Sequence, residues 1–139
     1  ISLMNQKTGA IGMSNTTFAD PSGLDEGNVS SVGDLLRLAQ YIHENRSFIL
    51  ELTENHDLPT AYVSGEFADL TNFNEVDELE NFIGGKVGET AAAGQTSLTL
   101  HTLMVQGQER TLAIILLGSK QRNQDVTDLL EYAETRFGG

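Results

Sequence analysis

Residues 82–117, FIGGKVGETAAAGQTSLTLHTLMVQGQERTLAIILL, decide the fold. Three stretches in them have strand character: a glycine-rich one from Phe82 to Gly88, a rough polar and apolar alternation from Gln95 to Val105, and an apolar run from Thr111 to Leu117. The link Gln106-Gly107-Gln108-Glu109 is hairpin-like, with glycine available for a positive φ. An unbroken apolar run is typical of a strand covered on both faces, so we expect three antiparallel strands packed under other elements.

Helical patterns lie on both sides of these strands in the sequence. Residues 1–10 read as the last turns of a helix, and a short helix is predicted from Phe48 to Leu52 before an extended stretch from Thr60 to Val63. A longer helix begins with Ser31 as N-cap and Asp34 three residues later, which together form a capping box. Apolar residues at helical spacing mark the buried faces of this helix (Val32, Leu35, Leu36, Ala39 and Ile42) and of a closing helix (Val126, Leu129, Leu130, Ala133 and Phe137). The sequence therefore predicts an α+β fold, an antiparallel sheet with flanking helices.

Composition excludes several classes of function. The chain has 139 residues, which suits one domain or a large piece of one, and its formal net charge is −12. Such a chain repels phosphate backbones and anionic membrane surfaces, so we expect no nucleic-acid partner. No apolar run approaches the roughly 20 residues that span a bilayer, and no signal-peptide pattern is present.

Metal and cofactor chemistry is not indicated either. The chain has no cysteine, and its three histidines, His43, His56 and His101, lack the spacing of a helical zinc site. We expect no metal, no cofactor and no thiol chemistry. His101 lies in a predicted strand and is interpreted as a surface or hydrogen-bonded residue, and most carboxylates as a solvated face. No serine lies in Gly-x-Ser-x-Gly, which excludes the nucleophile turn of the α/β-hydrolases.

The segment Gly84-Gly85-Lys86-Val87-Gly88-Glu89-Thr90 is the most informative part of the chain. Glycine weakens a strand unless something must approach its backbone closely. A lysine at this place offers a mobile cation beside an open strand edge. Together these features suggest a groove for an extended peptide that carries a carboxylate. The alternative is a twisted or bulged strand with a solvated Lys86, and the residues alone favour neither.

Several ordered segments together resemble the low-molecular-weight serine D-alanyl-D-alanine carboxypeptidases, penicillin-binding proteins with the motifs Ser-x-x-Lys, Ser-x-Asn and Lys-Thr-Gly. Residues 83–90, followed by Ala93-Gly94, are similar to the Lys-Thr-Gly segment, which lies on a strand beside the active site in that family. The other matches keep the family's order over nearly the whole chain: residues 4–5, 12–18, 21–25, 30–39, 71–74 and 116–118, then Arg122 and residues 129–130. The resemblance implies a partial β-lactamase/transpeptidase-like fold.

Two of the family's motifs are absent. No asparagine has a serine two positions earlier, and the residues three positions before the only lysines, Lys7, Lys86 and Lys120, are Met4, Ile83 and Leu117. A literal Lys7-Thr8-Gly9 stands at the end of a helix pattern and is interpreted as coincidence. We therefore expect residues 1–139 to be the C-terminal portion of a carboxypeptidase-like domain, with both missing motifs in a segment that precedes it.

The resemblance implies roles for five residues. Lys86 would supply positive charge beside the Ser-x-Asn serine and the substrate carboxylate. The backbone N–H of Glu89 would be one oxyanion donor, and Val87, Gly88 and Thr90 would contact the extended peptide. Val87 stands where the family has Thr or Ser, whose hydroxyl helps to bind the terminal carboxylate. Losing that hydrogen bond would cost about 1.5–3 kcal/mol of binding.

The implied activity is that of a serine-type D-Ala-D-Ala carboxypeptidase, which hydrolyses peptidoglycan stem peptides through an acyl-enzyme. Without the nucleophile, this chain alone is expected to be inactive. The alternative is a non-catalytic relative that binds peptidoglycan peptide or acts as a scaffold. The expected partners are a stem peptide or β-lactam once the N-terminal segment is supplied, and a homodimer or strand-exchanged partner at the sheet edge left exposed. The family usually acts outside the cytoplasmic membrane, which implies the same location here.

Overall fold

The computed structural model describes residues 1–54, 74–76, 79 and 81–138. These residues form, in chain order, α1 (Ser2–Ala10), α2 (Val32–Asn45), α3 (Phe48–Glu54), β1 (Phe82–Thr90), β2 (Gly94–Val105), β3 (Gln108–Ser119) and α4 (Arg122–Phe137). The predicted α+β architecture is confirmed. The extended stretch predicted from Thr60 to Val63, and residues 71–73 of the family-like segment, lie outside the described residues.

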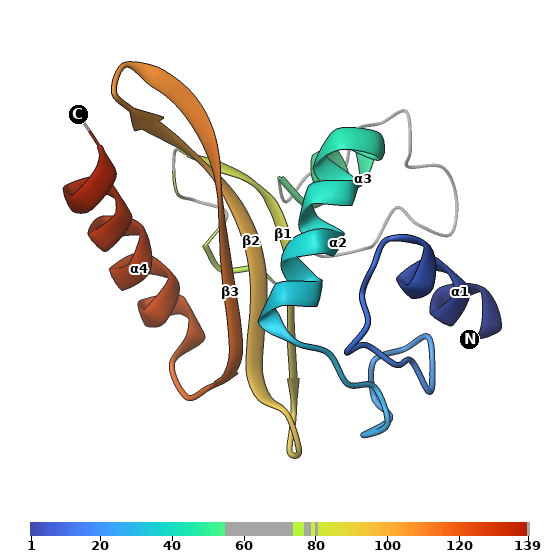
Figure 1. Ribbon diagram of the computed structural model, residues 1–139. Helices are drawn as coiled ribbons and strands as arrows, with labels where there is room; N and C mark the ends of the chain where they lie inside the picture. Colours follow the sequence, from blue (N-terminus) through green and yellow to red (C-terminus); the bar gives the residue numbers. More distant parts are fainter. Residues whose placement is uncertain (55–73, 77–78, 80, 139) are drawn as a thin grey trace, which may run out of the picture.

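The sheet is antiparallel and forms the middle of three layers. Its strand order is β1-β2-β3, so among the described residues β1 and β3 are its two margins. The register pairs Lys86 of β1 with Leu98 of β2, and Leu98 with Ile115 of β3. Figure 1 shows α4 on one face of the sheet and α2 with α3 on the other. The layers therefore separate the two ends of the chain.

The hairpin between β2 and β3 turns through two residues with positive φ. Gln106 has φ 51° and Gly107 has φ 73°, a pattern whose twist matches that of the flanking strands. The expected use of glycine at this turn is confirmed. The left-handed conformation of Gln106 was not predicted, because a residue with a side chain adopts this region only at some cost in free energy. The turn fixes the register of the two longest strands.

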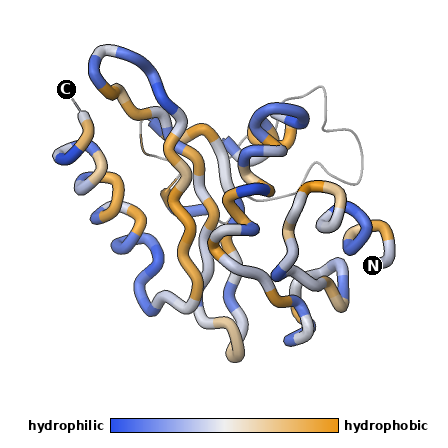
Figure 2. The backbone as a smooth tube through the Cα atoms, in the orientation of Figure 1, coloured by the Kyte–Doolittle hydropathy of each residue, from blue (hydrophilic) through white to orange (hydrophobic). Residues whose placement is uncertain are grey.

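Two apolar clusters hold the layers together (Figure 2). On the α4 side, Phe82, Ile114, Val126 and Leu130 are buried together with Val76. On the other side, the cluster combines one residue from each of three elements, Ala39, Leu50 and Leu100, with partly buried neighbours. The strands are thus apolar toward both helical layers, which is why their sequence shows little strict alternation.

The expectation that β3 is covered on both faces is wrong in part. In the run from Thr111 to Leu117 only Ile114 is buried, and Leu117 is 47% exposed. β3 lies at a margin of the described sheet, so the helices shield it incompletely.

The predicted apolar faces of two helices are also too wide. In α2 Val32 and Leu36 are exposed, and in α4 Leu129 and Phe137 are exposed. Ala39, Val126, Leu130 and Ala133 are the residues of these faces that are buried.

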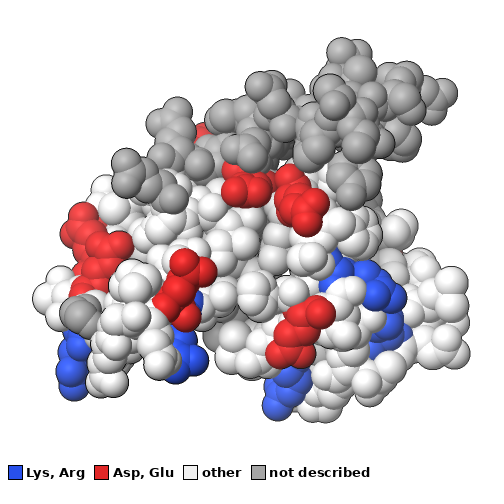
Figure 3. All heavy atoms as spheres, turned by 90° about the horizontal axis from the view of Figure 1, so that it is seen from above, with Lys and Arg blue, Asp and Glu red and all other residues white. Residues whose placement is uncertain are grey.

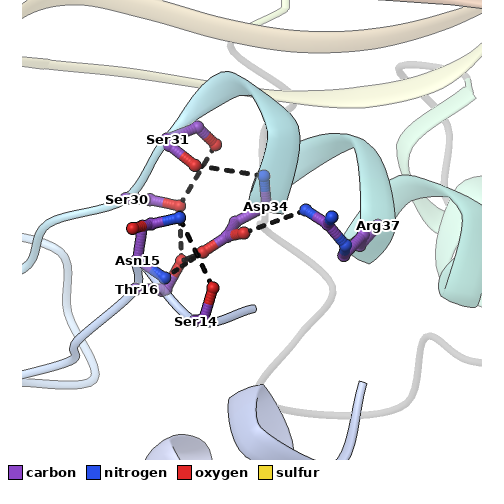
Figure 4. A network of polar contacts seen from close by, with 7 residues as sticks. All are labelled: Ser14, Asn15, Thr16, Ser30, Ser31, Asp34 and Arg37. Atoms are coloured by element: carbon purple, nitrogen blue, oxygen red, sulfur yellow. Dashed lines mark hydrogen bonds and ion pairs between the residues drawn. The ribbon is translucent and has the colours of Figure 1, made fainter. Parts of the chain in front are cut away.

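The capping box at the start of α2 is only half formed. The backbone N–H of Asp34 donates to Ser31 Oγ (3.2 Å), as the N-cap prediction required. The Asp34 carboxylate points away from the cap instead: Oδ2 accepts from the backbone N–H of Asn15 (2.7 Å) and from Thr16 Oγ1 (2.8 Å), as Figure 4 shows. This carboxylate is fully buried, so the interpretation of the acidic residues as a solvated face does not hold for Asp34.

Candidate active-site edge

The five residues singled out by the sequence lie on β1, at a margin of the described sheet. Lys86 and Glu89 are exposed, and Gly88 and Thr90 are half-buried. Val87 is only 9% exposed, so its side chain belongs to the interior rather than to the open surface. The strand therefore presents the charged side chains of Lys86 and Glu89 to solvent.

The close approach that the glycines predicted is made by the protein itself. A Cβ on Gly84, whose φ is +151°, would lie 2.8 Å from the carbonyl oxygen of Leu50 and 2.9 Å from Thr53 Oγ1, both in α3. A Cβ on Gly85 would lie 2.6 Å from the carbonyl oxygen of Leu98 in β2. These two glycines let α3 and β2 pack against β1, so they are not themselves evidence for a ligand groove.

The direction of the backbone groups along β1 follows from three hydrogen bonds. The N–H of Gly85 donates to Thr53 Oγ1 (3.0 Å), so it points away from β2. The carbonyl of Gly88 accepts from Thr96 Oγ1 of β2 (3.2 Å), so it points toward β2. Successive residues of a strand point their backbone groups to opposite sides, and the pairing from Gly84 to Thr90 is regular. Val87 and Glu89 therefore direct N–H and C=O groups to the free side, which is the side on which no strand among the described residues pairs with β1.

The Lys86 side chain reinforces this assignment. Its ammonium group donates to the carbonyl oxygen of Val87, on the free side of the strand. The cation thus lies against the unpaired edge, beside the outward N–H groups of Val87 and Glu89. The combination offers two backbone donors and a mobile positive charge, which suits an anionic, extended ligand.

Arg122 and Gln95 brace the far end of this edge, and the residue patterns did not single out Gln95. Arg122 donates through Nη1 to the carbonyl of Gly88 (3.2 Å), and its backbone N–H donates to Gln95 Oε1 (2.9 Å). Gln95 Nε2 in turn donates to the Glu89 carboxylate (3.3 Å). These contacts join β1, β2 and the start of α4. Because they connect positions up to 34 residues apart, no local pattern could have indicated them.

Neither of the two described histidines, His43 and His101, contributes to this edge. His101 is fully buried, so of its two interpretations the surface residue is wrong and the hydrogen-bonded residue is confirmed at Nε2. Its Nε2 lies 3.0 Å from Thr99 Oγ1, and its ring meets Phe82 edge-on at 5.6 Å. Burial lowers the pKa of His101 to about 4, so the ring is neutral at pH 7. Within the described residues, no three His, Asp or Glu side chains gather as a metal site would require.

A cavity lies on another part of the described surface. It measures about 690 Å³ and opens between the C-terminal half of α4 and the end of β2. Leu103, Leu130 and the carboxylates of Glu131 and Glu134 line it, and none of residues 86–90 does. This cavity is therefore separate from the groove that the sequence predicted at Lys86.

The antiparallel sheet between helices matches the fold of solved penicillin-binding proteins, which belong to the transpeptidase-like class, and β1 carries Lys86-Val87-Gly88 at the margin of this sheet. The chain belongs to the D-alanyl-D-alanine carboxypeptidase family, whose sequence profile matches residues 1–120. The recognised resemblance is therefore confirmed.

Individual relatives agree with this assignment. The D-alanyl-D-alanine carboxypeptidase DacF of Bacillus subtilis is 27% identical over 137 residues, which are 96% of this chain and 34% of that protein. Penicillin-binding protein D2 of Listeria monocytogenes, solved with cefotaxime bound, has a TM-score of 0.76 and 27% identity over 94% of this chain and 53% of its own. A D-alanyl-D-alanine carboxypeptidase from Mycobacterium tuberculosis shares the fold, with a TM-score of 0.72 at 23% identity over 97% of this chain and 53% of its own. This chain thus spans about a third of the curated relative and about half of each solved chain.

Proposed function

We propose that residues 1–139 form the peptide-binding wall of a serine-type D-Ala-D-Ala carboxypeptidase and are the C-terminal portion of its domain. The observation that supports this is the free edge of β1, where Val87 and Glu89 direct backbone N–H groups outward beside the Lys86 ammonium. The nucleophile would come from a segment N-terminal to these residues. The substrate would be a peptidoglycan stem peptide, which places the reaction outside the cytoplasmic membrane. No helix of the described residues is long and apolar enough to cross a bilayer.

In this mechanism the extended stem peptide adds to β1 as a further strand. The scissile carbonyl accepts from the N–H of Glu89, which stabilises the oxyanion together with a donor beside the nucleophile. Thr90 contacts the peptide on the N-terminal side of the scissile carbonyl, and Gly88 contacts it on the C-terminal side. Lys86 leaves the Val87 carbonyl and turns its charge toward the terminal carboxylate and the hydroxyl that shuttles the proton.

The chain by itself is proposed to be inactive, because its 139 residues contain no Ser-x-x-Lys. Losing the nucleophile of a serine protease removes on the order of a million-fold in rate. A fluorescent penicillin should therefore leave the isolated chain unlabelled. The positive control is the same chain fused to the N-terminal half of the DacF domain, which should become labelled. Covalent labelling of the isolated chain would contradict the proposed role.

A non-catalytic, peptide-binding relative is the second candidate, and Val87 in place of Thr or Ser is the observation that favours it. The fusion separates the two candidates. A fusion that folds and binds the peptide, yet stays unlabelled unless Val87→Thr is introduced, would assign this chain to the non-catalytic class.

We also propose self-association through the opposite margin of the sheet. β3 has one paired neighbour among the described residues, and an unpaired strand of 12 residues is a ready template for another. Sedimentation should then show a concentration-dependent dimer, which Ile115→Lys should weaken. A monomer at all concentrations would exclude it.

A further inference from the structure

The free edge of β1 is closed at one end by α3. Helix α3 packs on β1, and the contact is close enough that its Leu50 Cα lies 3.0 Å from a Cβ built on Gly84. The N–H of Gly85, which would otherwise face an added strand, is already taken by Thr53 Oγ1 at 3.0 Å. At Gly85 the edge therefore offers no donor to an incoming peptide.

Thr53 is held in place for this contact by its own helix. Its hydroxyl donates to the carbonyl oxygen of Leu50 (3.0 Å), so a lone pair remains for the Gly85 N–H. A hydroxyl that both donates and accepts has little freedom to turn away. The two hydrogen bonds of the Thr53 hydroxyl therefore fix the contact between α3 and β1.

The direction of an added peptide follows from the charge at the same end. In an antiparallel arrangement, a peptide that passes Glu89 runs with its C-terminus toward Lys86, at the middle of β1. In a parallel arrangement the N-terminal ammonium would face this cation and be repelled. The geometry points to a site that takes the C-terminal end of a peptide, with Thr53 as the residue that sets where the chain must stop. This inference rests on the proposed function and adds the determinant of its specificity for chain ends.

The register of pairing with β1 sets how many peptide residues the edge can accept. A peptide residue paired with Glu89 is followed by residues opposite Gly88, Val87 and Lys86 before the chain meets Gly85. There is room for about three residues beyond the one at Glu89, which is a path of roughly 10 Å. A peptide ending in a free carboxylate fits this length, whereas the middle of a long chain meets α3.

The test uses the isolated, isotope-labelled chain and follows the amide resonances of Val87 and Glu89 by NMR. The probes are acetyl-Lys-D-Ala-D-Ala and the same peptide extended by four glycines at its C-terminus. We expect the short peptide to shift both resonances with a Kd at least tenfold lower than that of the extended one. In Thr53→Ala, which frees the Gly85 N–H, the ratio should fall to about threefold or less, and the matched variant Thr53→Ser should keep it.

The possible outcomes distinguish a failure of this inference from a failure of the proposed function. Equal binding of the two peptides by the unchanged chain would leave the proposed edge binding intact and overturn the stop at α3. A tenfold ratio that Thr53→Ala leaves unchanged would overturn the role of Thr53. If neither peptide shifts Val87 or Glu89, the proposed function fails and this inference fails with it.

Discussion

At the scale of single residues, Asp34 is the polar group on which the packing of the N-terminal loop depends. Its carboxylate is fully buried and accepts from Asn15 and Thr16, which lie 19 and 18 residues earlier in the chain. Arg37 adds an ion pair at 3.1 Å but is half exposed, so this pair contributes little. The buried hydrogen bonds therefore fix the loop to the start of α2.

Asp34→Ala is expected to lower the free energy of unfolding by about 3 kcal/mol, because it leaves the Asn15 N–H and the Thr16 hydroxyl buried without their charged acceptor. Urea unfolding followed by circular dichroism measures this change. Ser31→Ala removes only the N-cap and should cost about 1 kcal/mol. Equal losses in the two variants would show that Asp34 acts merely as part of the cap.

At the scale of elements, the contact between α3 and β1 depends on the absence of a side chain. Gly84→Ala combines a strained φ with a Cβ 2.8 Å from the backbone of α3, so it should cost about 2 kcal/mol and raise the amide exchange rate throughout α3. Gly9→Ala is the matched control. Its Cβ meets nothing within 4 Å and it lies in α1, so it should be neutral or slightly stabilising. Unchanged exchange in Gly84→Ala would mean that α3 does not rest on β1.

The elements themselves follow from local signals, and the contacts between them do not. The Ser31 cap, the Gln106-Gly107 turn and the apolar spacing of α4 each act within a few residues. Each correctly predicts its element, although the predicted buried face of α4 is too wide. The sequence also places Lys86 on a strand at the sheet margin. It does not indicate that Thr53 occupies the N–H of Gly85, since that bond joins residues 32 positions apart. The reason why positions 84 and 85 are glycine could be identified only from the packing of α3 and β2 against β1.

At the scale of the whole molecule, the formal net charge is −12. On the face that Figure 3 shows, acidic and basic side chains form separate small groups among uncharged residues. Screening at physiological ionic strength limits the influence of such charges to about 8 Å.

Attraction of a carboxylate to β1 thus depends on Lys86 nearby and not on the overall field. Lys86→Gln should therefore weaken binding of acetyl-Lys-D-Ala-D-Ala by threefold or more in the NMR titration. A C-terminal amide in place of the carboxylate should remove the difference between the two proteins.

The stability of the whole molecule should fall in mild acid because His101 is buried uncharged between the sheet and α4. The pKa of His101 is lowered to about 4 in the folded protein from an ordinary 6.5, so the unfolded chain binds more protons between these values. The contribution is fully present above pH 6.5 and is lost as the pH falls toward 4. By linkage it amounts to about 2 kcal/mol between pH 7 and pH 5.

Urea unfolding at these two pH values measures the loss, and His101→Gln should remove most of it. His43→Gln, which changes an exposed histidine on α2, should keep it. Asp20 does not interfere, because hydrogen bonds from Ser22 and Asn28 lower its pKa and shift its titration below this window. If the His101→Gln protein lost as much stability as the unchanged chain between pH 7 and pH 5, the acid sensitivity would have to arise from another group.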